Sequence, residues 1–297
     1  MRCYCCHKSW QTYDIKILSI IAPLENNELK KLFHIENSKS DNGQQILSLR
    51  LGQKHACYAI SNKSGSELYE LVYCCVNEWS ENELTDLFSA SPLLQNSFYL
   101  VQVVYDFPES ILVSSKDYKP EDAALLLSTV AGSIGNTNII SELITDWQLY
   151  NIYGVPKEIH DYIGTKFSSA RFWQQYTLGI KNSNAAGNEG SLLIDIRKND
   201  FTVIVAKSSK ILLAQTFEYT TPEDILFYLL KCCQQFSISQ REVHLQLSGL
   251  IDKQSTLYKE LYQYFVNIEF RDASWNATND CPAHFFTSLN DLAKCAS

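Results

Sequence analysis

Residues 190–236 read GSLLIDIRKNDFTVIVAKSSKILLAQTFEYTTPEDILFYLLKCCQQF, and their pattern is the strongest indication of the fold. Three apolar runs, at 192–196, 201–206 and 211–217, are separated by the short polar turns RKND and KSSK. Apolar runs joined by turns this short are typical of neighbouring antiparallel strands. The stretch therefore predicts a three-stranded antiparallel meander.

A helix is predicted directly after this meander. Thr221 is placed to cap the helix N-terminus, Pro222 suits the first helical position, and Asp224 completes a capping-box pattern. Apolar residues then recur at helical spacing along one face, at Ile225, Leu229, Cys233 and Phe236.

The first half of the chain repeats this order of elements without repeating the sequence. Strands are predicted at 46–51, 56–61 and 67–76, and Ser80 begins a helix through a Ser-x-x-Glu pattern with Glu83. In each half a further strand and a further helix follow. These elements are expected at 98–104 and 120–131 in the first half, and at 242–247 and 255–265 in the second, with a last short strand at 267–270.

The pattern divides the chain into two similar halves. Residues 1–45 are interpreted as an N-terminal extension, and 46–181 as the first half, which ends in a connecting helix predicted at 168–181. Residues 182–189, within the turn-rich sequence NSNAAGNEG, are the expected linker. Residues 190–297 form the second half, whose weakly helical end (283–294) is free to pack on either half.

Two halves of this pattern resemble the duplicated α/β fold of actin, Hsp70 and the sugar kinases, the actin-like or ribonuclease H-like fold. More specific signals are the segments 106–109 (DFPE), 111–113 (ILV), 147–153 (WQLYNIY), 219–224 (YTTPED) and 247–251 (LSGLI). In these segments the sequence resembles a Bacteroidetes family known as domain of unknown function 3822, and the resemblance covers about residues 46–272. That family is distantly similar to cytoplasmic actin-like proteins of pilus and secretion machines, and no activity is known for it.

The resemblance implies where a nucleotide would bind. In active actin-like ATPases an Asp-x-Gly turn in each half orients hydrated Mg²⁺ and lets the backbone approach the phosphates. In the second half Asp195 stands in the right place, but Arg197 replaces the glycine and Lys198 replaces the expected hydroxyl.

The other two loops depart from the ATPase pattern as well. In the first half Arg50 and Gly52 occupy the corresponding turn, without a carboxylate, and the adenosine loop keeps a single glycine, Gly249. These losses predict a protein without ATPase activity, and therefore no catalytic residues. If nucleotide binding survives, the residues expected to contact ATP and Mg²⁺ are Asp195, Arg197, Lys198, Arg50, Gly52 and Gly249.

Other polar residues receive simpler interpretations. Arg50, Arg197 and Lys198 are expected at exposed hairpin turns, where they keep the meanders soluble. Asp106, which precedes Phe107 and Pro108 at a strand end, is expected to serve in a turn.

Composition excludes several classes of protein. The formal net charge of −8 argues against binding to nucleic acid. No apolar run approaches the roughly 20 residues that span a membrane, and no secretory signal is recognised, so a cytoplasmic location is expected.

A zinc site would need the N-terminal cluster Cys3, Cys5, Cys6 and His7 to meet Cys281 and His284, and no metal site is predicted.

The sequence thus favours a non-enzymatic actin-like module that holds an unknown partner protein or peptide in its interdomain cleft or at an exposed strand edge. The alternative is a degenerate nucleotide-binding switch or kinase of the actin and Hsp70 superfamily. A third, metal-dependent hypothesis depends entirely on the cysteines near the two ends of the chain.

Overall fold

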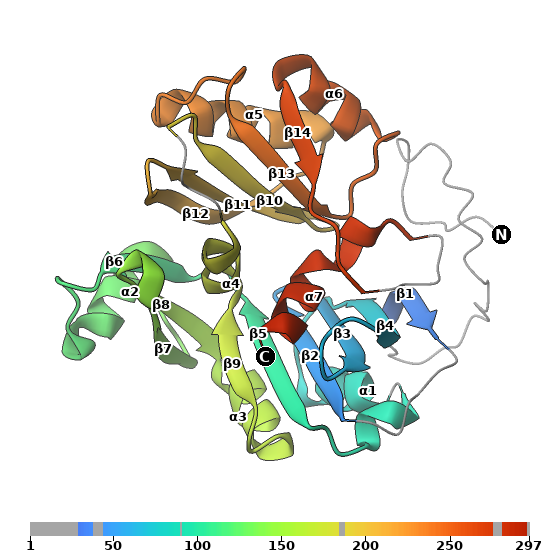
Figure 1. Cartoon of the computed structure of the whole chain (residues 1–297). Helices are drawn as coiled ribbons and strands as arrows, with labels where there is room; N and C mark the ends of the chain where they lie inside the picture. The colour runs from blue at the N-terminus through green and yellow to red at the C-terminus, as the bar shows by residue number, and fades with distance from the viewer. Residues whose placement is uncertain (1–28, 38–43, 90, 184–187, 276–280, 296–297) are drawn as a thin grey trace.

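The structure is a computed structural model that describes residues 29–37, 44–89, 91–183, 188–275 and 281–295. Two large sheets face each other across the middle of the molecule, and a small third sheet lies beside them (Figure 1). The first sheet has the order β1-β4-β3-β2-β5-β9 and the second the order β12-β11-β10-β13-β14.

The strands of the first sheet are β1 (Lys30–Glu36), β2 (Gln45–Gly52), β3 (His55–Asn62), β4 (Leu68–Cys75), β5 (Leu100–Asp106) and β9 (Arg171–Gln174). Those of the second are β10 (Ser191–Ile196), β11 (Asp200–Lys207), β12 (Lys210–Glu218), β13 (His244–Gly249) and β14 (Asn267–Phe270).

Both predicted meanders are confirmed. Strands β2, β3 and β4 pair antiparallel, as do β10, β11 and β12. On the other side of each first strand the sheet continues with parallel pairs, β2–β5–β9 and β10–β13–β14. The same arrangement in both halves is the predicted duplicated actin-like fold.

Side-chain alternation gives each large sheet one strongly apolar face. In β2 the side chains of Leu47, Leu49 and Leu51 enter the core of the first half. In β10 those of Leu192, Ile194 and Ile196 enter the core of the second half. The residues between them therefore project from the opposite faces, where the two halves meet.

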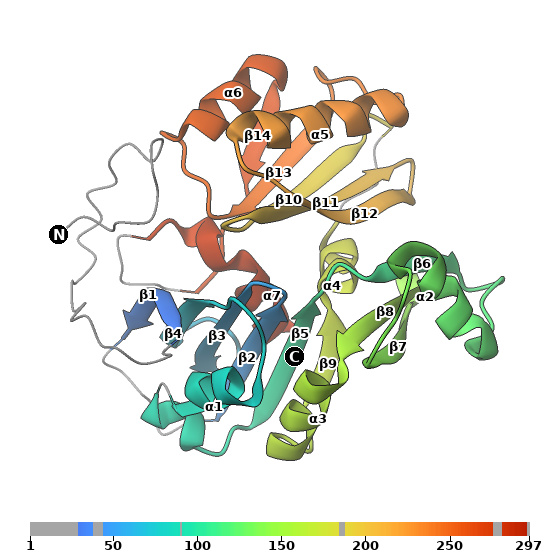
Figure 2. The same cartoon turned by 180° about the vertical axis from the view of Figure 1, so that it is seen from behind.

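The helices cover the outer faces and the junction between the halves (Figures 1 and 2). The predicted helix after the second meander is present, and its capping box forms as expected, because Asp224 accepts hydrogen bonds from the backbone N–H groups of Thr220 and Thr221 at 2.9 Å. The helices are α1 (Glu81–Ser89), α2 (Ala123–Ala131), α3 (Lys157–Lys166), α4 (Gln175–Asn182), α5 (Pro222–Gln235), α6 (Thr256–Tyr264) and α7 (Thr287–Lys294).

The predicted connecting helix at 168–181 is partly wrong. Its first part is β9, which pairs parallel to β5, and the helix α4 begins only at Gln175. Phe172 and Trp173 suit a strand, and pairing with a sheet edge outweighs the weak local preference for a helix. The side-chain oxygen of Gln174 then accepts from the backbone N–H of Tyr176 and caps the new helix at 2.5 Å.

Two further strands of the first half lie outside the predicted pattern. Strands β6 (Ser110–Ser114) and β7 (Thr137–Ile144) pair with opposite edges of β8 (Leu149–Pro156) and form the small third sheet. Strand β1, at residues 30–36, extends the first sheet beyond β4, so this sheet begins before the expected boundary at residue 46. The remainder of the expected N-terminal extension, other than residues 29–37 and 44–45, lies outside the described residues.

The helix α7 lies between the two large sheets, at the centre of Figure 1. It contacts β2, β3 and β5 of the first half and β13 of the second. In the part of the chain that the structure describes, no helix has the length and apolar composition required to cross a membrane.

Candidate functional site

A group of charged side chains gathers where the carboxyl ends of the parallel strands of both sheets face each other. Arg50 lies near the end of β2, Asp106 is the last residue of β5, and Asp195 lies near the end of β10, followed by Arg197. Arg50 alternates with the core leucines of β2, and Asp195 alternates with the core residues of β10. Both therefore project into the space between the halves, where ligands of open α/β sheets usually bind.

Arg50 connects both halves through its guanidinium group. Its Nη2 lies 2.7 Å from Oδ2 of Asp106 in the first half and 2.6 Å from Oδ2 of Asp195 in the second. Its Nε donates to the same Asp106 oxygen at 3.0 Å, and its Nη1 donates to the Ser288 hydroxyl of α7 at 2.6 Å. One side chain thus joins the two sheets and the helix between them.

Arg197 adds a second guanidinium group beside the first. Its Nη1 lies 3.4 Å from Oδ2 of both Asp106 and Asp195. Its Nε pairs with Asp200 at the start of β11, and its Nη2 donates to the Thr202 hydroxyl at 3.0 Å. We call Arg50, Asp106, Asp195 and Arg197 the interdomain ion-pair cluster.

The cluster is sealed from solvent and its members remain ionised. The exposed fractions of Arg50, Arg197, Asp106 and Asp195 are 4%, 3%, 5% and 8%. Burial alone would raise the pKa of both carboxyl groups, but the attraction of the two guanidinium groups is stronger. The pKa of Asp106 is therefore well below the ordinary value of an aspartate, and the pKa of Asp195 is also below that value. The carboxylates in turn raise the pKa of both arginines despite their burial.

His55, the first residue of β3, borders the cluster on the side of the first half. Its Nε2 lies 3.2 Å from Oδ2 of Asp106, and its ring stacks on Tyr73 with centroids 5.7 Å apart. Burial lowers the pKa of His55, and this effect exceeds the opposing influence of Asp106. The imidazole is therefore neutral and adds no further charge.

The two glycines predicted to face a nucleotide are required by the packing of the chain itself. A Cβ at Gly52 would lie 2.2 Å from the ring of His55. Gly249 has a φ of +83°, and a Cβ there would lie 2.0 Å from the carbonyl oxygen of Ile196 in the neighbouring strand.

The structure brings some of the predicted site residues together and separates one of them. Arg50, Asp195 and Arg197 are in contact, whereas Gly52 lies opposite Asp106 in the first sheet and Gly249 lies opposite Ile196 in the second. Lys198 is exposed, as expected, and its Nζ lies 3.6 Å from Sγ of Cys75 in the first half. The expectation that Arg50 and Arg197 are exposed at hairpin turns is wrong, because each is drawn inward by carboxylates from both halves.

Sequence reasoning missed one member of the cluster, Asp106, and one residue that binds it, Ser288. Asp106 was expected to serve in a turn, yet it accepts from Arg50 and lies within ion-pair distance of Arg197. Its position at the end of the strand that runs parallel to β2, directly opposite Gly52, was the available signal. Ser288 comes from α7, and nothing in the local sequence indicates its place.

The helix α7 lies between the halves and makes polar contacts with both (Figure 2). Gln102 of β5 donates to the carbonyl oxygen of Leu292 at 2.5 Å, and Asn290 donates to that of Gly65 at 2.9 Å. On the other side Arg271 pairs with Asp291 at 2.7 Å. A cavity of about 20 Å³ beside Asp195, which α7 also lines, has room for about one water molecule.

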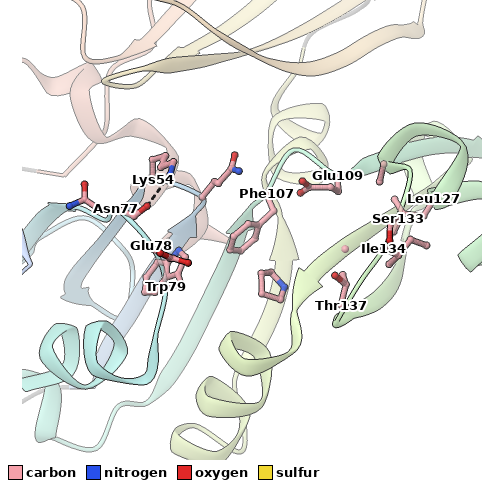
Figure 3. Close-up of a pocket in the computed structure, with 14 residues that line it drawn as sticks. Lys54, Asn77, Glu78, Trp79, Phe107, Glu109, Leu127, Ser133, Ile134 and Thr137 are labelled. Carbon is pink, nitrogen blue, oxygen red and sulfur yellow. Dashed lines mark hydrogen bonds between the residues drawn. The ribbon is translucent and has the colours of Figure 1, made fainter.

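A much larger pocket, of about 330 Å³, lies at the seam between the first sheet and the small third sheet (Figure 3). One wall comes from the β2–β3 turn and the segment between β4 and α1, and the other from α2, β7 and β8. Its lining residues are Gln53, Lys54, Asn77, Glu78, Trp79, Phe107, Glu109, Leu127, Ala131, Ser133, Ile134, Thr137, Gly154 and Pro156.

The other candidate residues form no site in the part of the chain that the structure describes. The described residues contain no group of three or more His, Cys, Asp or Glu side chains arranged to hold a metal ion. His284 is hydrogen-bonded to the carbonyl oxygen of Ile251 at 2.6 Å. The cluster Cys3, Cys5, Cys6 and His7 lies outside the described residues.

Comparison with solved structures shows the same fold elsewhere. A Bacteroides thetaiotaomicron protein with an actin-like ATPase fold and unknown function superposes with a TM-score of 0.71 and 22% identity, over 85% of this chain and 96% of that one. A chain from the PilM–PilN type IV pilus biogenesis complex superposes with a TM-score of 0.56 and 11% identity, over 84% of this chain and 98% of that one.

Sequence comparison places the chain in a family. No curated protein matches it. The family model described as "Protein of unknown function (DUF3822)" matches residues 34–268, which is most of the chain and includes the whole interdomain ion-pair cluster. This protein is therefore a member of the DUF3822 family, with an actin-like fold.

Proposed function

We propose that this protein is a non-catalytic actin-like module that binds a partner protein and does not hydrolyse nucleotide. The observation that carries the proposal is the interdomain ion-pair cluster. Its two guanidinium groups lie between the halves, at the turns where an actin-like ATPase would hold phosphate and Mg²⁺, and they pair there with Asp106 and Asp195.

The chemistry of the cluster supports this proposal. Asp195, the carboxylate expected to orient hydrated Mg²⁺, is ion-paired to Arg50 and lies beside Arg197. A phosphate that entered would have to displace buried carboxylates from both arginines. Removing one partner from a buried ion pair leaves an uncompensated charge, which is strongly unfavourable. The cluster therefore does not fit a Mg-nucleotide without rearrangement.

Between the halves α7 contacts strands of both sheets, and the cavity beside it has a volume of only about 20 Å³, which leaves little room for a partner segment there. The pocket at the seam with the third sheet is larger and opens onto exposed residues such as Glu78 and Glu109.

The similarity of the fold to a chain from a two-protein complex, PilM–PilN, supports a protein partner. The acidic composition supports the expectation that nucleic acid is not the partner, and a cytoplasmic location is part of the proposal.

Phosphate release from Mg-ATP tests the non-catalytic part of this function. We expect the purified protein to release phosphate no faster than the variant Asp195→Asn, and no faster than buffer. Steady release that the substitution abolishes would overturn the proposal in favour of an ATPase or kinase.

A further inference from the structure

We propose that the pocket between the first sheet and the small third sheet binds a partner segment in which a basic side chain lies next to an apolar one. This inference rests on the proposed function and specifies the partner's chemistry. The pocket volume of about 330 Å³ falls within the range of ligand-binding pockets.

The inner part of the pocket suits an apolar side chain. Phe107 and Leu127 are buried, while Ile134 and Pro156 are half-buried beside them, and all four line the pocket. Gly154 belongs to the same surface, and a Cβ there would meet Thr137 at 2.8 Å, so the backbone itself forms part of the wall. An apolar side chain placed here would remove these surfaces from water, which is the main favourable contribution to such binding.

The mouth of the pocket is acidic. Glu78 and Glu109 come from opposite walls, and both are exposed (Figure 3). Among the described residues neither carboxylate forms an ion pair with the protein. Lys54, the cation in the lining, donates its Nζ to the carbonyl oxygen of Asn77 at 2.9 Å. The Lys54 ammonium group keeps its charge, so the mouth carries two negative charges and one positive charge, and this net negative charge favours a cationic group.

Trp79 adds a third feature to the same mouth. Its indole Nε1 donates to the carbonyl oxygen of Gly52 at 2.8 Å, and this bond fixes the orientation of the ring in the pocket wall. Lysine ammonium and arginine guanidinium groups bind favourably over an indole face. The combination of Trp79 with Glu78 and Glu109 selects a basic side chain over a neutral one of similar size.

The exposed rim favours a continuous chain over a small isolated cation. Residues on the surface line the pocket on both sides of the seam: Gln53, Lys54, Asn77, Glu78, Glu109 and Ser133. A segment that lies along this seam would place one side chain inward and its basic neighbour between the two carboxylates.

Three matched peptides test the proposal. They are acetylated and amidated forms of Gly-Ser-Lys-Leu-Leu-Ser-Gly, in which Lys is kept, replaced by Gln or replaced by Glu. Binding to the whole protein is followed through the ¹⁵N–¹H signal of the Trp79 indole, assigned with Trp79→Phe. We expect saturable binding of the Lys peptide, at least tenfold weaker binding of the Gln peptide, and no binding of the Glu peptide.

The double variant Glu78→Gln/Glu109→Gln should bind the Lys peptide with an affinity at least tenfold lower than that of the original protein. The matched control Glu81→Gln/Glu121→Gln changes two exposed glutamates outside the pocket and should leave its affinity unchanged. Equal binding of all three peptides, absence of saturable binding by the Lys peptide, or an equal effect of both double variants would overturn the inference. Each of these outcomes is independent of the phosphate-release assay. A negative result for peptide binding in the pocket is therefore distinguishable from a negative result for the proposed non-catalytic function.

Discussion

The side chain of Arg50 makes polar contacts with three parts of the chain that are far apart in sequence. Its partners are Asp106 in the first half, Asp195 in the second half and Ser288 in α7. Each contact is charge-assisted and sealed from water, which makes the loss of one partner costly to the others. The group therefore couples the positions of both sheets and the helix between them.

Replacing Arg50 by alanine should leave two buried carboxylates short of their counter-charge. We expect Arg50→Ala to lower the free energy of unfolding by about 3–5 kcal/mol, because breaking a buried ion pair strands the remaining charge. Urea denaturation measures this value. The control Lys198→Ala, at an exposed neighbouring position, should stay within about 0.5 kcal/mol of the original protein. A loss below 1 kcal/mol for Arg50→Ala would show that the cluster does not hold the halves together.

Glu142 in β7 predicts a pH dependence of stability. Burial raises its pKa from 4.5 to about 7, against the opposing influence of the Thr177 hydroxyl, the Gln174 N–H and Lys181. The folded state thus binds the proton more tightly than the unfolded state. Stability contributed by this group is full below pH 4.5 and declines as the pH rises toward 7, by up to about 3 kcal/mol.

The variant Glu142→Gln isolates this contribution. Its free energy of unfolding, measured by urea denaturation between pH 4.5 and pH 8, should fall less with rising pH than that of the original protein. The difference between the two proteins should therefore grow toward neutral pH, with the glutamine variant the more stable. Parallel pH profiles would show that the pKa of Glu142 is not raised.

Among the elements, α7 packs between the two halves and contacts strands of both. Leu292 is fully buried and packs against Val104 of β5 and Leu178 of α4. The polar contacts of Ser288 and Asn290 fix the helix at its other positions. A short helix of this kind depends on tertiary packing for its stability, since its length alone is insufficient.

Truncating Leu292 should therefore destabilise the whole protein. We expect Leu292→Ala to lower the free energy of unfolding by about 2–5 kcal/mol, as buried leucines typically do. The matched control is Leu125→Ala in α2, where the side chain is 68% exposed and the expected loss is within about 0.5 kcal/mol. Equal effects of the two substitutions, measured by urea denaturation, would contradict the packing role of α7.

The sequence predicts those elements whose signals are local. The meander at 192–217 follows from apolar runs and short turns, and α5 follows from Thr221, Pro222 and Asp224. Strand β9 could not be predicted in this way, because its extended form depends on pairing with β5. The position of α7 depends on contacts with both halves, and the sequence of the helix alone does not show where the partners of these contacts lie.

At the scale of the whole molecule, the two halves bring together residues that are separate in the sequence. The turn positions of Arg50, Asp195 and Arg197 could be identified from the resemblance to an actin-like fold. Their burial could not, because it arises from ion pairs between the halves and from the contact with Ser288 of α7, which form only when both halves and α7 are assembled. The large pocket has the same origin, since its walls come from two different sheets.

In the proposed function, the protein's own ion pairs occupy the place that a Mg-nucleotide takes in an actin-like ATPase. Isothermal titration of the purified protein with Mg-ATP, with thermal denaturation in the same buffer, tests this part of the proposal. Saturation at 100 times the dissociation constant would add about 2.7 kcal/mol to the stability and raise the melting temperature clearly. We predict no binding heat and no shift in melting temperature at millimolar Mg-ATP. Saturable heat accompanied by a rise in melting temperature would contradict the account, because the cluster would then open to admit phosphate.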